Sequence, residues 1–388
     1  MSIQSSRSPL HDVVIVGAYN TKQAKRLEVN EIDVLLDAVH GALASSGMTI
    51  DEVDGFNITS STQRFHTRQS VMLFGARPSW TGSDIGIPAV IEAALAISAG
   101  LCETAIIATA QVSAHRDRQK TAPWTRPTNE FVECWGLFTP VEFALMAQRH
   151  MHLYGTNEDH FAEIAATIRN NGARHPQACH YGKFVTPQDV LNSRMIAEPF
   201  HLLDCAMTSE GGAALVLTSV ERAADLDVQP IYLLGGGTDK QGMAYVTAPV
   251  WDKYGAVGRR AAQQAFSQAG LTPDDVDVLE IYDPFSFEII RQLEVFGFCG
   301  TGEGGDFVME GHLRMDGKYP MVTNGGLMSF SHAGLAQLIQ KPISAVQQLR
   351  GEYPRELTVK DAKVALTSNG GSGALFTDVL LLGTQRAA

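Results

Sequence analysis

The sequence predicts an α/β protein made of two similar lobes. The first observation is an internal repeat: residues 42–58 align without a gap on residues 265–281, an offset of 223 (265 − 42), with 7 of 17 residues identical. The second is that the same order of strand and helix patterns flanks both copies. The third is that two helical patterns are apolar on all sides, which is typical of helices buried between layers. We therefore expect two duplicated α/β lobes with central helices between their sheets.

Each lobe opens with a strand followed by an amphipathic helix. In the first lobe, the apolar residues 12–17 predict the strand and residues 29–46 predict the helix, which ends at a glycine. In the second lobe, the corresponding patterns lie at residues 231–235 and 254–268, and this helix also ends at a glycine. The order of elements that leads into the repeat is therefore the same in both lobes.

A further helix and strand follow the repeat in each lobe. In the first lobe, residues 88–99 predict an apolar helix and residues 105–108 a strand. In the second lobe, residues 335–349 predict the helix and residues 364–367 the strand. These are the two helices that we expect at the centre of the molecule.

The two lobes differ by an insertion. We predict an N-terminal half at residues 10–228 that includes a capping insertion at about residues 110–200, and a C-terminal half at residues 229–388. Helical patterns near residues 140–152 and 157–171 belong to the insertion. Its expected role is to cover the functional site.

Composition narrows the class of protein. The formal net charge of −12 argues against nucleic acid or an anionic membrane as a partner. Residues 1–10 contain no hydrophobic signal segment, and no run reaches the ~18 apolar residues of a membrane span. We expect a cytoplasmic protein.

The cysteines suggest neither a metal site nor a disulfide framework. They are odd in number and form no Cys-x-x-Cys pair: Cys102, Cys134, Cys179, Cys205 and Cys299. We therefore predict no metal ion in this protein.

The glycine-rich segment at residues 323–334 contains the first candidate functional residue, His332. Two adjacent glycines allow backbone amides to approach a ligand, and Ser329 or Ser331 is a suitable N-cap for the following helix. We expect His332 where the loop becomes a helix, because the free N–H groups there favour a neutral imidazole and attract negative charge. The alternative is a surface histidine in a glycine-rich turn.

Four runs of residues together resemble the thiolase superfamily. They are Asn-Gly-Gly…Ser-His-Ala-Gly at residues 324–334, Leu-Asp-Cys-Ala-Met-Thr-Ser-Glu-Gly-Gly-Ala-Ala at 203–214, Tyr-Asp-Pro-Phe at 282–285 and Ser-Asn-Gly-Gly-Ser-Gly at 368–373. The resemblance spans nearly the whole chain, and it is greater to the thiolase-like sterol carrier and lipid-transfer group than to the degradative thiolases. It implies a thiolase-like fold with layers in the order αβαβα, and a homodimer.

The sequence departs from the thiolase pattern at the nucleophile. A thiolase carries one cysteine at a loop-to-helix start in the first half, which holds the acyl group, and a second in the C-terminal glycine-rich loop. The aligned positions here are Ser83 and Ser368. Because a serine hydroxyl is a far weaker nucleophile than a thiolate, we do not expect an acyl-enzyme. We expect both serines to line the substrate site instead.

Tyr282 is the second candidate catalytic residue. Its Tyr-Asp-x-Phe motif resembles that of the thiolase-like aldolases of steroid side-chain degradation, which cleave a β-hydroxyacyl-CoA without a nucleophilic cysteine. Those aldolases are expected to carry a second tyrosine where His332 stands, so the resemblance leaves open which residue is the base. His332, near pKa ~6.5 before perturbation, is an easier base than a tyrosine near ~10. The alternative for Tyr282 is a structural tyrosine at the end of a strand.

Further residues are expected to bind the substrate. The amides of Gly325 and Gly326, or of Gly370 and Gly371, are candidates to stabilise an enolate oxygen. Trp135 is a candidate wall of the acyl pocket. The alternatives are a plain turn for the Gly370 loop and a core position for the tryptophan.

The resemblance implies a lyase that cleaves a C–C bond of a bulky β-hydroxyacyl-CoA by retro-aldol chemistry, with a steroid side chain as the candidate acyl group. CoA enters as part of the substrate, and no other cofactor is needed. A small OB-fold, zinc-ribbon subunit is a possible partner. Two alternatives are an acyl-CoA acyltransferase that uses Ser83 or an unaligned cysteine, and a catalytically silent subunit that binds lipid or acyl-CoA.

Overall fold

A computed structural model describes residues 8–60, 67–112, 139–242, 249–371 and 374–387 of the 388-residue chain. Nine strands form one mixed sheet in the order β3-β2-β4-β7-β1-β8-β11-β10-β9. Their bounds are β1 Val13–Asn20, β2 Gly55–Ser60, β3 Trp80–Thr81, β4 Thr104–Gln111, β7 Gly211–Ser219, β8 Ile231–Lys240, β9 Val278–Glu280, β10 Val364–Gly371 and β11 Phe376–Gly383.

The sheet contains the same strand pattern twice. Outward from β1 the neighbours are β7, β4 and β2, and outward from β8 they are β11, β10 and β9. In both series the first two pairings are antiparallel and the third is parallel. The predicted duplication is therefore confirmed. The expectation of separate sheets needs correction, because β1 and β8 join the halves through the pairs Val14–Tyr232 and Ile15–Ile231.

Hydrogen bonds of the repeated segment also occur twice. At the start of β4, the carboxylate of Asp54 accepts from the N–H groups of Glu103 at 2.9 Å and Thr104 at 3.1 Å. At the start of β10, its counterpart Asp277 accepts from the N–H groups of Lys363 at 2.7 Å and Val364 at 2.9 Å. The shared Asp of the repeat therefore fixes the start of the same strand in each half.

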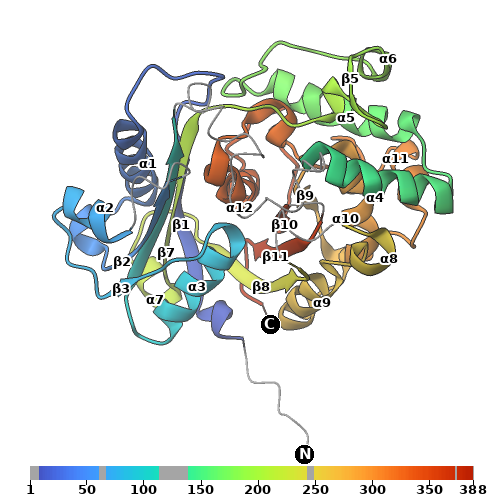
Figure 1. The fold of residues 1–388 in the computed structure, drawn as a ribbon. Helices are drawn as coiled ribbons and strands as arrows, with labels where there is room; N and C mark the ends of the chain where they lie inside the picture. The colour runs from blue at the N-terminus through green and yellow to red at the C-terminus, as the bar shows by residue number, and fades with distance from the viewer. Residues whose placement is uncertain (1–7, 61–66, 113–138, 243–248, 372–373, 388) are drawn as a thin grey trace, which may run out of the picture.

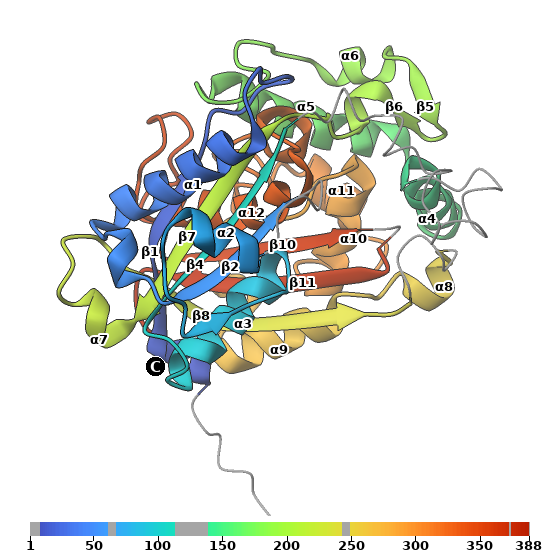
Figure 2. The same cartoon turned by 60° about the vertical axis from the view of Figure 1, so that its left-hand side comes forward.

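Helices complete five layers around the folded sheet. The central helices α3 (Gly86–Ser98) and α12 (Gln337–Leu349) share one apolar core with strands from both halves. Helix α1 (Glu31–Ser46) covers the outer face of the N-terminal half. Helices α9 (Arg259–Ala269) and α10 (Ser286–Phe296) cover the C-terminal half. Figure 1 shows α12 near the middle and α1 on the far side of β1 and β7, and Figure 2 shows α9 along β8 and β11. The αβαβα order is confirmed.

The insertion contributes helices that pack on the C-terminal half. They are α4 (Thr139–Tyr154), α5 (Glu158–Arg174) and α6 (Pro187–Leu191), followed by a hairpin of β5 (Met195–Ala197) and β6 (Phe200–His201). The remaining short helices are α2 (Thr67–Leu73), α7 (Val220–Ala223), α8 (Trp251–Tyr254) and α11 (Gly304–Met309). Within the described parts of the chain, no helix combines the length and apolar character needed to cross a bilayer.

Two helix predictions need correction. The helix expected at residues 254–268 is divided into α8 and α9, because Gly258 adopts φ +105° immediately before α9. The helix expected from residue 335 begins instead at Gln337, after a 3-10 turn at Gly334–Ala336. The second change moves His332 away from the start of α12.

Candidate active site

Tyr282 lies in the loop between β9 and α10, and its side chain is 6% exposed. Its backbone is held on both sides. The N–H donates to Ser368 Oγ at 2.9 Å, and the C=O accepts from Gln292 Nε2 at 2.6 Å. The hydroxyl of Ser368 donates in turn to Gln292 Oε1. The hydroxyl of Ser368 is therefore buried and holds Tyr282 in place, a role that the sequence did not predict.

His332 is held with one ring nitrogen committed to the protein. Its Nδ1 lies 2.8 Å from the carbonyl oxygen of Met207. A carbonyl can only accept, so Nδ1 carries the proton and the neutral ring presents an unprotonated Nε2. The backbone N–H of His332 donates to Ser209 Oγ at 2.8 Å, and its C=O accepts from the N–H of Ser209 at 3.2 Å. The imidazole is thus oriented by two residues of one segment.

The reason for a neutral His332 differs from the one expected. Burial lowers the pKa of His332 below its usual value, and the hydrogen bond to Met207 opposes that shift. Neither proposed serine caps the following helix, since Ala336 occupies its N-cap position. Ser329 Oγ donates to the carbonyl of Arg169 at 3.3 Å, and Ser331 Oγ donates to Gln23 Oε1 at 2.6 Å. Desolvation, rather than the dipole of α12, therefore accounts for the lowered pKa.

The segments that carry Tyr282 and His332 are joined through Asp283. Its carboxylate accepts from the N–H groups of Leu327 at 2.9 Å and Met328 at 3.3 Å, in the π-helical turn Gly326–Phe330. Lys341 Nζ of α12 lies 2.5 Å from the same carboxylate, and both side chains are at most 2% exposed. Asp283 therefore fixes the tyrosine loop against the turn that leads to His332.

A third segment, residues 203–209, contacts the same two segments. The N–H of Ala206 donates to the carbonyl of Pro284 at 2.8 Å, and the N–H of Met207 donates to the carbonyl of Leu327 at 3.1 Å. Met207 is also the residue that accepts from the His332 ring. Residues 203–209, 282–285 and 326–332 therefore converge.

Gly325 and Gly326 do not offer the free amides that were expected. The N–H of Gly325 donates to the carbonyl of Val322 at 2.9 Å, and that of Gly326 to Asn324 Oδ1 at 2.8 Å. Glycine is required here because both residues have positive φ, +95° and +48°. A Cβ at Gly326 would also overlap the carboxylate of Asp283. Their role is to let the turn approach Asp283.

Replacing Gly326 by alanine is therefore expected to cost about 2–4 kcal/mol of unfolding free energy, from backbone strain and overlap together. Urea denaturation measures it. Gly270→Ala is the matched control, because Gly270 has φ +67° with no heavy atom within 4 Å of an added Cβ. It isolates the cost of the backbone conformation. Equal losses in the two variants would contradict a packing role for Gly326.

The backbone N–H groups of Gly370 and Gly371 point to opposite edges of β10. The N–H and C=O of Val364 both bond to Asp277 on the β9 side, and the N–H groups of alternate residues in a strand point to the same edge. The N–H of Gly370 therefore points toward the β9 side, and that of Gly371 points toward β11. β9 pairs with β10 only as far as Thr367, and an added Cβ at Gly370 would lie 3.3 Å from the ring of Tyr282. The N–H of Gly370 is the better donor to a ligand beside Tyr282.

The start of α3 carries no nucleophile that reaches these residues. The Ser83 side chain is exposed, and its N–H lies 3.2 Å from a carboxylate oxygen of Glu92. No described contact brings Ser83 to Tyr282 or His332. The first residue of α3, Gly86, does approach the C-terminal half: an added Cβ would overlap Asn369 and lie 2.9 Å from Leu338 Cβ. Trp135, the expected pocket wall, lies outside the described residues.

The cysteines within the described residues are protonated thiols at neutral pH. Burial raises the pKa of Cys179 to about 11, and that of Cys102, Cys205 and Cys299 to about 12. The Ser209 side chain lowers the pKa of Cys179, but burial raises it by more. Cys134 lies outside the described residues. Where the structure describes a cysteine, it therefore offers no ready thiolate.

Sequence reasoning missed Arg169, which ties the insertion to the site. From α5 its guanidinium donates to the carbonyl oxygens of Leu203 at 2.8 Å, Met328 at 2.9 Å and Cys205 at 3.0 Å. Burial lowers its pKa to about 10, which leaves it charged at neutral pH. An arginine in an amphipathic helix gave no signal of this role, because only the tertiary fold brings those carbonyl groups together.

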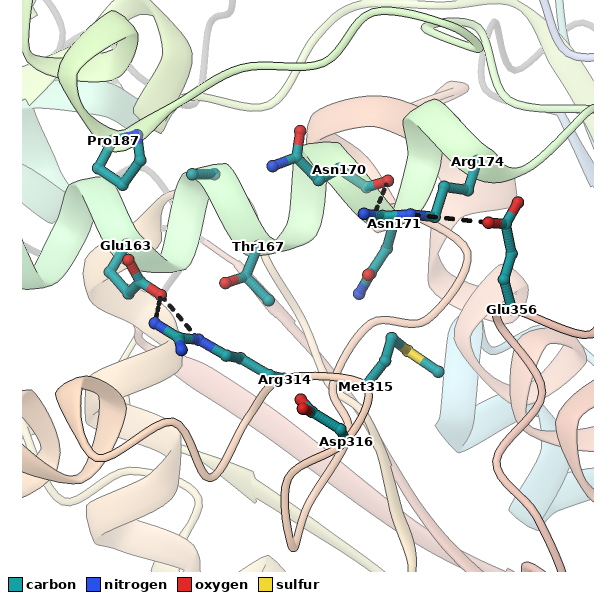
Figure 3. A pocket seen from close by; sticks show the side chains of 11 residues that line it. Glu163, Thr167, Asn170, Asn171, Arg174, Pro187, Arg314, Met315, Asp316 and Glu356 are labelled. Carbon is teal, nitrogen blue, oxygen red and sulfur yellow. Dashed lines mark hydrogen bonds and ion pairs between the residues drawn. The ribbon is translucent and has the colours of Figure 1, made fainter.

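A pocket of about 390 Å³ lies along α5, where Glu163, Thr167 and Asn170 line it (Figure 3). Its two arginines are paired with carboxylates: Arg314 with Glu163 at 2.7 Å and Arg174 with Glu356 at 3.9 Å. Neither arginine is therefore left as an unpaired cation for an anionic ligand. Tyr282 and His332 do not line this pocket.

A family model described as Thiolase C-terminal domain-like matches residues 247–384. The chain is 33% identical over 364 residues to the 17-hydroxy-3-oxo-4-pregnene-20-carboxyl-CoA lyase of Mycobacterium tuberculosis, covering 87% of this chain and 91% of that protein. It is 30% identical over 394 residues to the steroid side-chain-cleaving aldolase of Thermomonospora curvata, covering 96% of this chain and 98% of that protein. The solved structure of the Ltp2-ChsH2(DUF35) aldolase matches with a TM-score of 0.84 at 28% identity, covering 97% and 99%.

Proposed function

This chain belongs to the thiolase superfamily, and from that premise we propose that it is a carbon–carbon lyase that cleaves a bulky β-hydroxyacyl-CoA by retro-aldol chemistry. The observation that carries the proposal is the unprotonated Nε2 of His332, fixed by the Met207 hydrogen bond. The names of the two relatives, a carboxyl-CoA lyase and a steroid side-chain-cleaving aldolase, support this reaction class. They also support a steroid side chain as the acyl group.

His332 acts as the general base in this proposal. Nε2 takes the proton of the β-hydroxyl, and the oxygen becomes the carbonyl of the departing ketone or aldehyde. The bond between the α and β carbons breaks, and its electron pair moves into the thioester as an enolate. A lowered pKa suits His332 for this role, because the ring is then neutral at pH 7.

Tyr282 acts as the general acid. Its phenol donates a proton to the α carbon of the enolate, which completes a shortened acyl-CoA. The proton held by His332 then returns to Tyr282 through solvent, so the residues end as they began. The N–H of Gly370 stabilises the enolate oxygen, a contribution of about 3–4 kcal/mol for a well-aligned donor. Its position beside the Tyr282 ring supports this assignment.

Two other functions remain as competing hypotheses. An acyltransferase needs a nucleophile, and the raised pKa of Cys179 and the exposed side chain of Ser83 weigh against both candidates. A catalytically silent acyl-CoA-binding subunit would use the same fold without proton transfer. The specific orientation of His332 favours the lyase over that alternative.

We further propose that the lyase works in the cytoplasm as a homodimer with a small OB-fold, zinc-ribbon subunit. The homodimer is what the resemblance implies, and the cytoplasm is the expectation from composition. The naming of a DUF35 component in the Ltp2-ChsH2 aldolase structure supports a second subunit. CoA enters and leaves as part of the substrate and product.

The decisive test is to incubate the protein, with and without such a subunit, with a β-hydroxyacyl-CoA that has a tertiary hydroxyl. Mass spectrometry of the products is expected to show a shortened acyl-CoA and a ketone, while the intact mass of the protein stays unchanged. An acyl adduct that free CoA removes would instead establish the acyltransferase. Substrate binding without either result would establish the silent subunit.

A further inference from the structure

The two halves place corresponding three-residue rows on the face of the sheet that is turned toward the central helices. Each row crosses three adjacent strands at the same level, as the strand registers show. The row of the N-terminal half is Thr109–Ala213–Asn20, and that of the C-terminal half is Asn369–Asp378–Thr238. Thr109 and Asn369 are each the sixth residue of their eight-residue strand. The rows are therefore counterparts within the duplicated fold.

The C-terminal row bonds to the first turn of α3. When the Asn369 amide nitrogen faces Asp378 Oδ2, the two atoms lie 2.7 Å apart, and the amide oxygen accepts from the N–H of Ile87 at 2.8 Å. Asn369 also fills the space that a side chain at Gly86 would need. Asp378, Asn369 and the N-terminus of α3 thus form a continuous chain of hydrogen bonds.

The N-terminal row shows that the fold itself does not require this chain. Ala213 stands where the other half has Asp378, and Thr109 stands where it has Asn369. Asp378 is 1% exposed and its Oδ1 has no hydrogen-bond partner among the described residues, so it is costly to bury. A buried carboxyl that only one of two equivalent rows contains serves something specific to that half.

The surroundings of Asp378 favour its uncharged form. The pKa of Asp378 is raised to about 7, chiefly by burial; Lys240 lowers it, and the carboxylates of Asp84 and Asp239 raise it. Asp239 also accepts from the N–H of Gly258 at 3.0 Å and lies 3.7 Å from Arg260 Nε. An uncharged acid still accepts from Asn369, and it places no negative charge near a developing enolate.

We infer that Asp378 is a positioning residue which, through Asn369, fixes the first turn of α3 against Gly370, the proposed oxyanion donor. The inference rests on the proposed function for its catalytic meaning. A rotation of the Asn369 side chain would break its hydrogen bond to the start of α3, one residue before Gly370 in β10. Asp378 prevents that rotation by holding the amide nitrogen.

The test combines hydrogen exchange at the start of α3 with steady-state kinetics of the complete enzyme. Asn369→Thr and Asp378→Ala, which introduce the residues of the other row, are expected to speed exchange there and to lower kcat about tenfold, with KM nearly unchanged. Asp378→Asn is expected to keep wild-type protection and kcat at pH 6, and to exceed wild-type activity at pH 8.5, where Asp378 is ionised. Thr109→Val in the N-terminal row is the control that should change neither.

Unchanged exchange at α3 in Asn369→Thr would overturn the inference, as would equal losses of kcat in Asp378→Asn and Asp378→Ala. A wild type that binds acyl-CoA but never cleaves it would count against the proposed lyase alone. The exchange measurement tests the link from Asp378 to α3 in either case.

Discussion

Replacing His332 by alanine will lower kcat for C–C cleavage about 10²–10⁴-fold, the range that one general base contributes. Binding of the acyl-CoA should change little, because the imidazole acts on the hydroxyl proton rather than on the CoA. In the wild type, kcat/KM should fall on acidification through a pKa below 6.5, since burial lowers the pKa of His332 and protonation removes the base. That acidic limb should be absent from the residual activity of the variant.

Initial rates between pH 5 and 8, followed by release of the shortened acyl-CoA, measure this effect. His312→Ala is the control, because His312 is a surface histidine paired with Glu310 at 2.9 Å. Tyr282→Phe should lose kcat over the same range of magnitude, since it removes the proposed acid and keeps the ring. A His332→Ala enzyme with wild-type kcat would exclude His332 as the base.

The duplication was predictable because it leaves matched residues in the chain. Asp54 and Asp277 must each hold the start of a strand, so both copies keep aspartate, and seven identities remained visible. The apolar character of α3 placed it at the centre, because a helix without a polar face cannot face water. Helix α12 also carries Gln340, Lys341 and Gln348, which are buried against polar partners within the molecule. The joining of the halves at β1 and β8 left no such signal, since only two residue pairs make that contact.

The sequence was enough to select the candidate residues of the site, but not the hydrogen bonds between them. Motif spacing selected Tyr282 and His332, and the structure joins their loops through Asp283. Motifs cannot reveal that the amides of Gly325 and Gly326 are already used, because their acceptors depend on how the turn closes. The same limit applies to Ser368, because its hydrogen-bond partner Gln292 lies on α10, far away in the sequence.

Replacing Lys341 by methionine is expected to lower the free energy of unfolding by about 3–5 kcal/mol, the cost of leaving one member of a buried ion pair without its partner. Lys341 and Asp283 are 2% and 0% exposed, so water cannot replace the missing ammonium. Glu280, another fully buried carboxyl, also faces Lys341 and would lose its attraction. The turn that Asp283 holds leads to His332, so catalysis should fall together with stability.

The pH dependence of this loss distinguishes an unpaired charge from lost packing. Burial raises the pKa of Asp283, and Lys341 opposes that shift, so removing Lys341 raises the pKa further. A carboxyl with a raised folded-state pKa binds its proton more tightly when folded, so stability falls as pH rises above its unfolded-state value. The methionine variant should therefore lose more unfolding free energy at pH 8 than at pH 5, and adding Asp283→Asn should recover part of the loss.

Urea denaturation at both pH values measures this loss. The control is Lys318→Met, from the exposed Lys318–Asp274 pair at 2.7 Å, which should leave the denaturation midpoint unchanged. A loss that is the same at both pH values would show that packing, not the buried charge of Asp283, accounts for the effect.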